Sequence, residues 1–95
     1  MNRISEVQIQ VVKPRNGLIG FASCVLDDVI YLSSIGIFSK LDGTGYRLTY
    51  PTKVIGDQSL QIFHPINREI TQEIEKAIFT KLENLMEKEA FNNAF

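Results

Sequence analysis

The stretch QIFHPINREITQEIEK, residues 61–76, contains the change of period that decides the fold. Before it, Leu60 and Ile62 alternate with Gln61, which is typical of a strand with one buried face. After Pro65, apolar residues recur at spacings of three and four, which predicts one stripe down a helix over about 68–90. Asn67 or Thr71 can cap the start of this helix. The stripe consists of Ile70, Ile74, Ala77, Ile78, Leu82, Leu85 and Met86.

Upstream of this junction the chain alternates in short runs that are separated by turn signals. We expect strands over about 4–13, 18–26, 29–39, 46–50 and 58–64, with the turns or loops PRNG, DD, KLDGTG and PTKVIGD between them. Reversals this short leave no room for helical crossovers, so the strands form an antiparallel meander. The sequence therefore predicts one α+β domain over 1–95, with a sheet of about five strands over 4–64 and one C-terminal helix packed on it.

Both faces of the middle strands are apolar. In the second strand, the small residues Gly20, Ala22 and Cys24 share one face, where a helix can lie close, while Phe21 and Val25 share the other. In the third strand, strict alternation puts Tyr31 with Ile35 and Ile37, and Ile30 with Leu32 and Phe38. One helix covers only one face of a sheet. We therefore expect a homodimer, in which a second chain covers the other face or the long first strand pairs with its copy at the edge of the sheet.

Charge and composition exclude some classes of protein. The 95 residues carry a net charge of −1, with seven basic and five acidic side chains in 1–68 against three and six in 69–95. This balance is far from that of a strongly basic nucleic-acid binder. Polar residues interrupt any apolar run near the start, and the single cysteine fits a reducing compartment, so we expect a cytoplasmic protein that does not associate with membranes.

The sequence contains no convincing catalytic, cofactor or metal site. His64 is the only histidine and precedes Pro65, and no motif places a nucleophile beside it, so we interpret it as part of the joint, bonded to nearby backbone. Cys24 lies inside an apolar strand, and Asp27–Asp28 read as an exposed turn where nothing separates two carboxyl pKa values. We expect neither an enzyme nor a small-molecule substrate.

Basic residues are the remaining candidates. Arg47 alternates with Tyr46 and Leu48, so it points to the face where Gln8, Gln10 and Gln61 also point. With Lys53 and Arg68 it can contact phosphates, although an ordinary solvated face would show the same residues. Tyr46 and Tyr50 could stack on bases, but the same alternation buries both.

Three segments carry a resemblance to a known family: ASCVLDD, IGIFSKLDGTGYRLTYPTK and FHPINREITQEIEKAIF. The specific parts are Ala22-Ser23 with Leu26-Asp27, then Pro51-Thr52-Lys53, and above all His64-Pro65-Ile66-Asn67 at the junction of sheet and helix. Together they resemble the SpoVG family, the stage V sporulation protein G or septation-regulator family of bacteria. The similarity extends from the first strand to the helix.

The resemblance implies a small dimer that binds DNA, and in some members RNA, in gene regulation linked to septation and sporulation. Lys53, Arg47 and Arg68 are then the leading nucleic-acid contacts, and Lys13 and Arg15 in the first hairpin are secondary ones. Members usually carry Lys-Arg after the Pro-Ser/Thr, whereas here Val54 stands where the arginine would be. This departure favours an alternative, a protein-interaction adaptor that has lost its affinity for nucleic acid.

Overall fold

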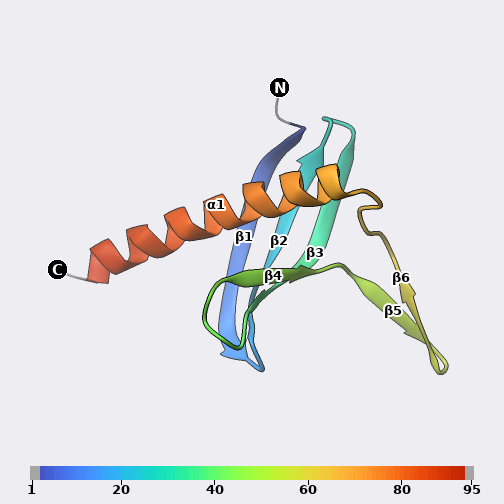
Figure 1. Ribbon diagram of the computed structural model, residues 1–95, viewed down its shortest axis with the longest axis horizontal. Coiled ribbons are helices and arrows are strands. Elements are labelled where there is room, and N and C mark those ends of the chain that lie inside the picture. Colours follow the sequence, from blue (N-terminus) through green and yellow to red (C-terminus); the bar gives the residue numbers. More distant parts are fainter. Residues whose placement is uncertain (1–2, 94–95) are drawn as a thin grey trace.

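A sheet, a two-stranded arm and one long helix make up the fold (Figure 1). The structure is a computed structural model that describes residues 3–93, and side-chain surroundings through residue 87. Strands β1 (Ile4–Arg15), β2 (Leu18–Leu26), β3 (Ile30–Ser39) and β4 (Tyr46–Thr49) form one antiparallel sheet in chain order. Strands β5 (Thr52–Ile55) and β6 (Gln58–Gln61) form a second sheet, and α1 spans Arg68–Asn93. The predicted α+β class and antiparallel meander with one C-terminal helix are confirmed.

The tight reversals occur where the turn signals predicted them. Asn16 and Gly17 adopt φ of 53° and 90°, the left-handed geometry that a two-residue turn between β1 and β2 requires. Asp27 and Asp28 adopt φ of 53° and 59°, although no glycine is present in the turn between β2 and β3. Aspartate tolerates this region better than most residues, so the DD turn is confirmed.

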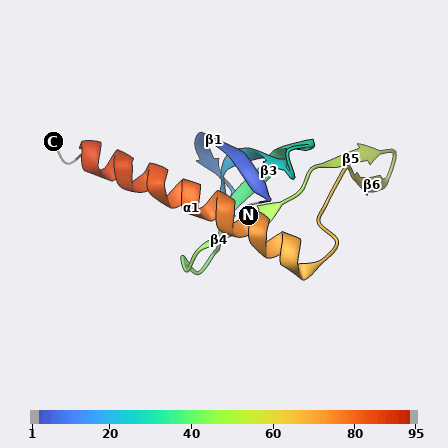
Figure 2. The ribbon, with the colours of Figure 1, turned by 90° about the horizontal axis from the view of Figure 1, so that it is seen from above.

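The segment after β4 differs from the expectation. The PTKVIGD segment, interpreted as a loop, contains β5, and β6 pairs with β5 rather than joining the main sheet. Pro51 has no N–H to donate, so β4 pairing ends before it, and Gly56 (φ 63°) closes a tight turn between the two new strands. The N–H of Ile62 donates to the Pro51 carbonyl at 2.9 Å and closes the base. We call residues 52–61 the arm, which extends away from the sheet (Figures 1 and 2).

The core lies between α1 and one face of the sheet, which the helix crosses obliquely (Figure 2). The predicted stripe is confirmed at Ile70, Ile74, Ile78 and Leu82, whereas Met86, which the pattern placed on it, is 43% exposed. The helix backbone lies nearest to β1, not to β2, whose small residues we expected it to approach. Burying each of the isoleucine side chains contributes about 1.5–3 kcal/mol. The buried residues are Ile4, Ala22, Cys24, Leu32, Ile35, Ile37, Ile70, Ile74, Ile78 and Leu82.

A β-bulge in β3 makes the predicted assignment of its side chains to the two faces of the sheet wrong for Tyr31 and Leu32. Ala22 pairs with Ile35 and Cys24 with Leu32, so β3 holds one residue more than β2 in this interval, and Ser34 adopts φ of 61°. The extra residue changes the side on which all earlier β3 side chains lie. Leu32 therefore joins Ile35 and Ile37 in the core, and Tyr31, expected beside those isoleucines, is 66% exposed.

The start of α1 is capped as predicted. The Asn67 side-chain Oδ1 accepts a hydrogen bond from the N–H of Ile70 at 2.8 Å, and the Thr71 hydroxyl donates to the Asn67 carbonyl at 2.7 Å. The first bond satisfies an N–H group that a helix start otherwise leaves unpaired. The side chains from residue 88 onward, Phe91 and Phe95 included, lie outside the described ones. Within residues 3–93, no helix is long and apolar enough to cross a membrane.

Candidate nucleic-acid interface

The face of the main sheet that turns away from α1 holds the candidate site, and we call it the open face. Residues that pair directly across antiparallel strands share a face, so the register assigns its members. Among residues 3–93 no second layer covers it. The open face consists of Gln8, Gln10, Arg15, Leu18, Phe21, Ser23, Val25, Tyr31, Gly36, Phe38, Arg47 and Thr49.

Two of the predicted cations lie at opposite ends of one row across the open face. Arg15 pairs with Leu18, Leu18 with Phe38, and Phe38 with Arg47, one residue from each of the four strands. Three strand spacings separate the ends, roughly 14 Å. The Arg47 guanidinium lies 4.6 Å from the centre of the Phe38 ring, a cation–π contact that holds it over the sheet. The predicted orientation of Arg47, on the side of Gln8 and Gln10, is confirmed.

The next row is uncharged and tightly packed at its centre. Gln10 pairs with Phe21, Phe21 with Gly36, and Gly36 with Thr49. A Cβ at Gly36 would lie 2.5 Å from the Thr49 hydroxyl oxygen and 3.3 Å from a ring carbon of Phe38. Glycine at this position therefore lets the threonine and the ring beneath Arg47 pack together.

The other predicted cations lie on different elements. Lys53 pairs with Leu60 in the arm, and Gln61, expected beside Arg47, also belongs to the arm. Arg68 is the first residue of α1, and Lys13 lies in β1. All five predicted cations are exposed, and the ion pairs found within the described residues involve none of them. The structure thus brings Arg15 and Arg47 onto one face and leaves Lys53 and Arg68 elsewhere.

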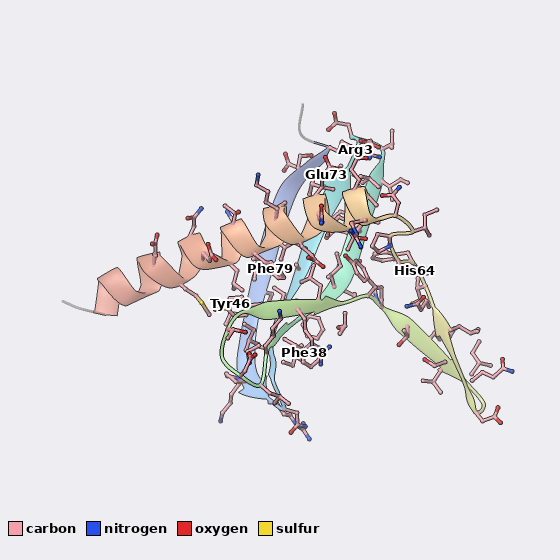
Figure 3. All side chains as sticks on the ribbon, viewed as in Figure 1. Arg3, Phe38, Tyr46, His64, Glu73 and Phe79 are labelled. Carbon is pink, nitrogen blue, oxygen red and sulfur yellow. The ribbon has the colours of Figure 1, made fainter. Side chains whose placement is uncertain are left out.

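His64 lies in the joint between arm and helix, at the edge of an apolar cleft of about 280 Å³ (Figure 3). Phe63, Tyr50 and Ile70 are among the lining residues. The imidazole is exposed, and the hydrogen bonds of the described residues do not include it, so the expected bond to backbone is absent there. The Tyr50 hydroxyl is buried without a partner, and burial raises its pKa to about 12.

One expectation about carboxyl groups is wrong. The Arg3 guanidinium donates to both carboxylate oxygens of Asp27, each at 3.1 Å, and lies 3.7 Å from Glu73 on the helix (Figure 3). The hydrogen bond from Arg3 lowers the pKa of Asp27, whereas the sequence suggested an unperturbed pair. These side chains join the chain start, the β2–β3 turn and α1. Cys24 is buried, and burial raises the pKa of its thiol, as expected for an unreactive core residue.

Comparison with known proteins decides the family. A family model described as SpoVG matches residues 1–84. The chain belongs to the SpoVG family. A SpoVG relative from Finegoldia magna, named "Putative septation protein SpoVG", is 29% identical over 89 residues, which is 93% of this chain and 81% of the relative. A protein of the same name from Treponema denticola is 31% identical over 75 residues, 79% of this chain and 80% of the relative.

The SpoVG motifs occupy two connected places in the structure. Pro51-Thr52-Lys53 opens the arm, and His64-Pro65-Ile66-Asn67 links the arm to α1 and supplies the helix cap. Val54, at the position where the resemblance led us to expect an arginine, is 70% exposed on β5. Two exposed aromatic residues of the open face, Phe21 and Tyr31, are not among the site residues predicted from the sequence. Alternation alone already pointed Phe21 away from the helix, but the bulge that exposes Tyr31 has no such signal.

Proposed function

We propose that this SpoVG protein is a cytoplasmic, non-enzymatic regulator that binds nucleic acid as a dimer in processes linked to septation. One observation carries the proposal: Arg15 and Arg47 lie on the same uncovered face, in one row, with only uncharged side chains paired between them. Positive donors on an accessible surface are what phosphate recognition needs.

The distribution of charge favours the open face, and not the helix, as the surface that binds nucleic acid. The acidic excess of residues 69–95 belongs to the α1 region, on the other side of the sheet. A polyanion on the open face is therefore separated from the acidic helix by the thickness of the sheet. Lys13 lies in β1, two residues before Arg15, and adds a further positive charge near this row.

The dimer contact is placed on the arm in this proposal. A two-stranded hairpin is marginally stable alone in water, and the arm exposes apolar side chains of both strands, Val54, Ile55 and Leu60. Ile55 and Leu60 share one face of the arm and Val54 lies on the other, so a second copy can cover one of these faces and leave the open face available. Light scattering should then give twice the 10.8 kDa mass of one chain.

The test is a titration of labelled mixed-sequence DNA and RNA at about 50 and 200 mM salt. Arg47→Ala and Arg15→Ala should each weaken binding and lower the log–log salt slope by about 0.7 for single strands or 0.9 for duplex DNA. Lys53→Ala and Arg68→Ala extend the series to the arm and the helix start. Lys81→Ala removes the same charge from an exposed position on α1, so it should leave affinity unchanged.

The exposed Val54 and its apolar neighbours favour one second candidate, an adaptor that binds another protein through the arm. A folded protein that binds no nucleic acid at low salt would contradict the leading proposal and favour this adaptor. Binding that all arginine variants retain in full would also contradict it, because the phosphate contacts would then lie elsewhere.

A further inference from the structure

Two exposed aromatic side chains lie on the open face beside a shallow hollow of about 470 Å³. Phe21 is 40% exposed and Tyr31 is 66% exposed, and both line this hollow. Phe21 is there by simple alternation along β2. Tyr31 is there because the bulge at Ser34 turns it away from the core.

Polar and apolar groups line the hollow in equal measure, and among the described residues that line it none is charged. Side chains with amide and hydroxyl groups line it between the two rings: Gln8, Gln10, Ser23 and Ser33. These groups can both donate and accept hydrogen bonds, as the edges of unpaired bases require. Among the described residues, no carboxylate lines the hollow to repel a phosphate backbone.

The spacing of the rings suits an extended ligand. Tyr31 pairs with Val25, which is four residues along β2 from Phe21, so the rings are anchored roughly 13 Å apart along the strand direction. At this separation they do not stack on each other, and each ring can accept a base. Beyond Phe21, the same face continues to the row that ends in Arg15 and Arg47.

We propose that the open face binds single-stranded nucleic acid, with bases stacked on Phe21 and Tyr31 and backbone phosphates near Arg15 and Arg47. Sheet faces that carry exposed aromatic residues can bind unpaired bases in this way, whereas the bases of a duplex are stacked on each other and unavailable. This inference rests on the proposed nucleic-acid function and specifies its surface and the form of the strand.

A second copy of the chain fits this face less well. Glutamine and serine side chains are among those that line the hollow, and a protein contact would have to satisfy their polar groups. The arm, by comparison, exposes apolar side chains on a two-stranded element whose stability increases when a partner covers it. Dimerisation through the open face is therefore the competing outcome of the test.

The experiment compares a labelled single-stranded RNA, the same sequence as DNA, and its duplex, by fluorescence anisotropy on the full chain. Phe21→Ala and Tyr31→Ala should each weaken single-strand binding about 5- to 150-fold, the range for losing one stacked base. Their effect on the duplex should be much smaller. Tyr31→Phe keeps the ring and should bind as the parent does. Leu41→Ala, at an exposed loop position away from the hollow, is the matched control.

Each outcome separates this inference from the broader proposal. If Arg47→Ala weakens binding while both aromatic variants bind single strands normally, the stacking surface is wrong and the nucleic-acid function stands. If the intact protein binds nothing, both are wrong. If Phe21→Ala or Tyr31→Ala turns a dimer into a monomer, the open face is a protein interface and the inference is overturned. Both side chains are substantially exposed, so circular dichroism should show an intact fold.

Discussion

Gly36→Ala should destabilise the protein, and the structure identifies the group responsible. The new Cβ would lie 2.5 Å from the Thr49 hydroxyl oxygen, so threonine must change rotamer, and the Phe38 ring at 3.3 Å must move slightly. Overpacking of this kind costs about 1–3 kcal/mol, whereas alanine gains about 0.5–1 kcal/mol over glycine in a strand. We expect a net loss of about 1–2 kcal/mol, which lowers the Tm by about 4–16 °C.

Thr49→Ala supplies the matched background, because it removes the hydroxyl oxygen and retains the Cβ. In that background Gly36→Ala should be neutral or slightly stabilising. The double-mutant cycle, measured by urea unfolding, should therefore give a coupling energy of about 1–3 kcal/mol. Equal costs of Gly36→Ala in the two backgrounds would refute the reasoning, since the clash would not then involve Thr49.

The same unfolding assay tests packing, capping and charge at other positions. Ile78→Val should cost about 0.5–1.5 kcal/mol at a fully buried site, and Ile66→Val, 88% exposed, should cost nothing measurable; equal effects would contradict the core assignment. Asn67→Ala should cost about 1 kcal/mol through loss of the cap, and Asn67→Asp should retain most of the stability. Arg3 holds the pKa of Asp27 below its usual 3.8, so this pair stabilises the fold above that pH, and the stability is lost as pH falls through the lowered pKa. Asp27→Asn should therefore give a Tm that declines less steeply below about pH 4, and an unchanged acid profile would show that the pair does not contribute.

The parts of the fold that followed from the sequence depend on local signals. The period change after Pro65 and the Asn16-Gly17 turn each determine geometry within a few positions. For this reason the helix and the first hairpin were predictable. The side on which Arg47 lies followed from alternation in a strand of only four residues.

The parts that could not be predicted depend on non-local register. Ser34 is an ordinary strand residue in the sequence, and only its pairing opposite β2 makes it a bulge that exposes Tyr31. Similarly, the segment 52–55 is too short for its sequence pattern to indicate a strand. It is a strand because it pairs with β6. The row from Arg15 to Arg47 joins residues from four strands, so it appears only once every register is known.

The arm has a consequence for the kinetics of amide hydrogen exchange. Its hydrogen bonds belong to a two-stranded ladder that is exposed throughout, and opening it disturbs none of the buried side chains of the core. Amides of residues 52–61 should exchange through local opening, long before those of Cys24 or Ile35, which wait for global unfolding. The arm can therefore lose and regain its structure while the sheet stays folded. Slower exchange of these amides would therefore show directly that a binding partner covers the arm.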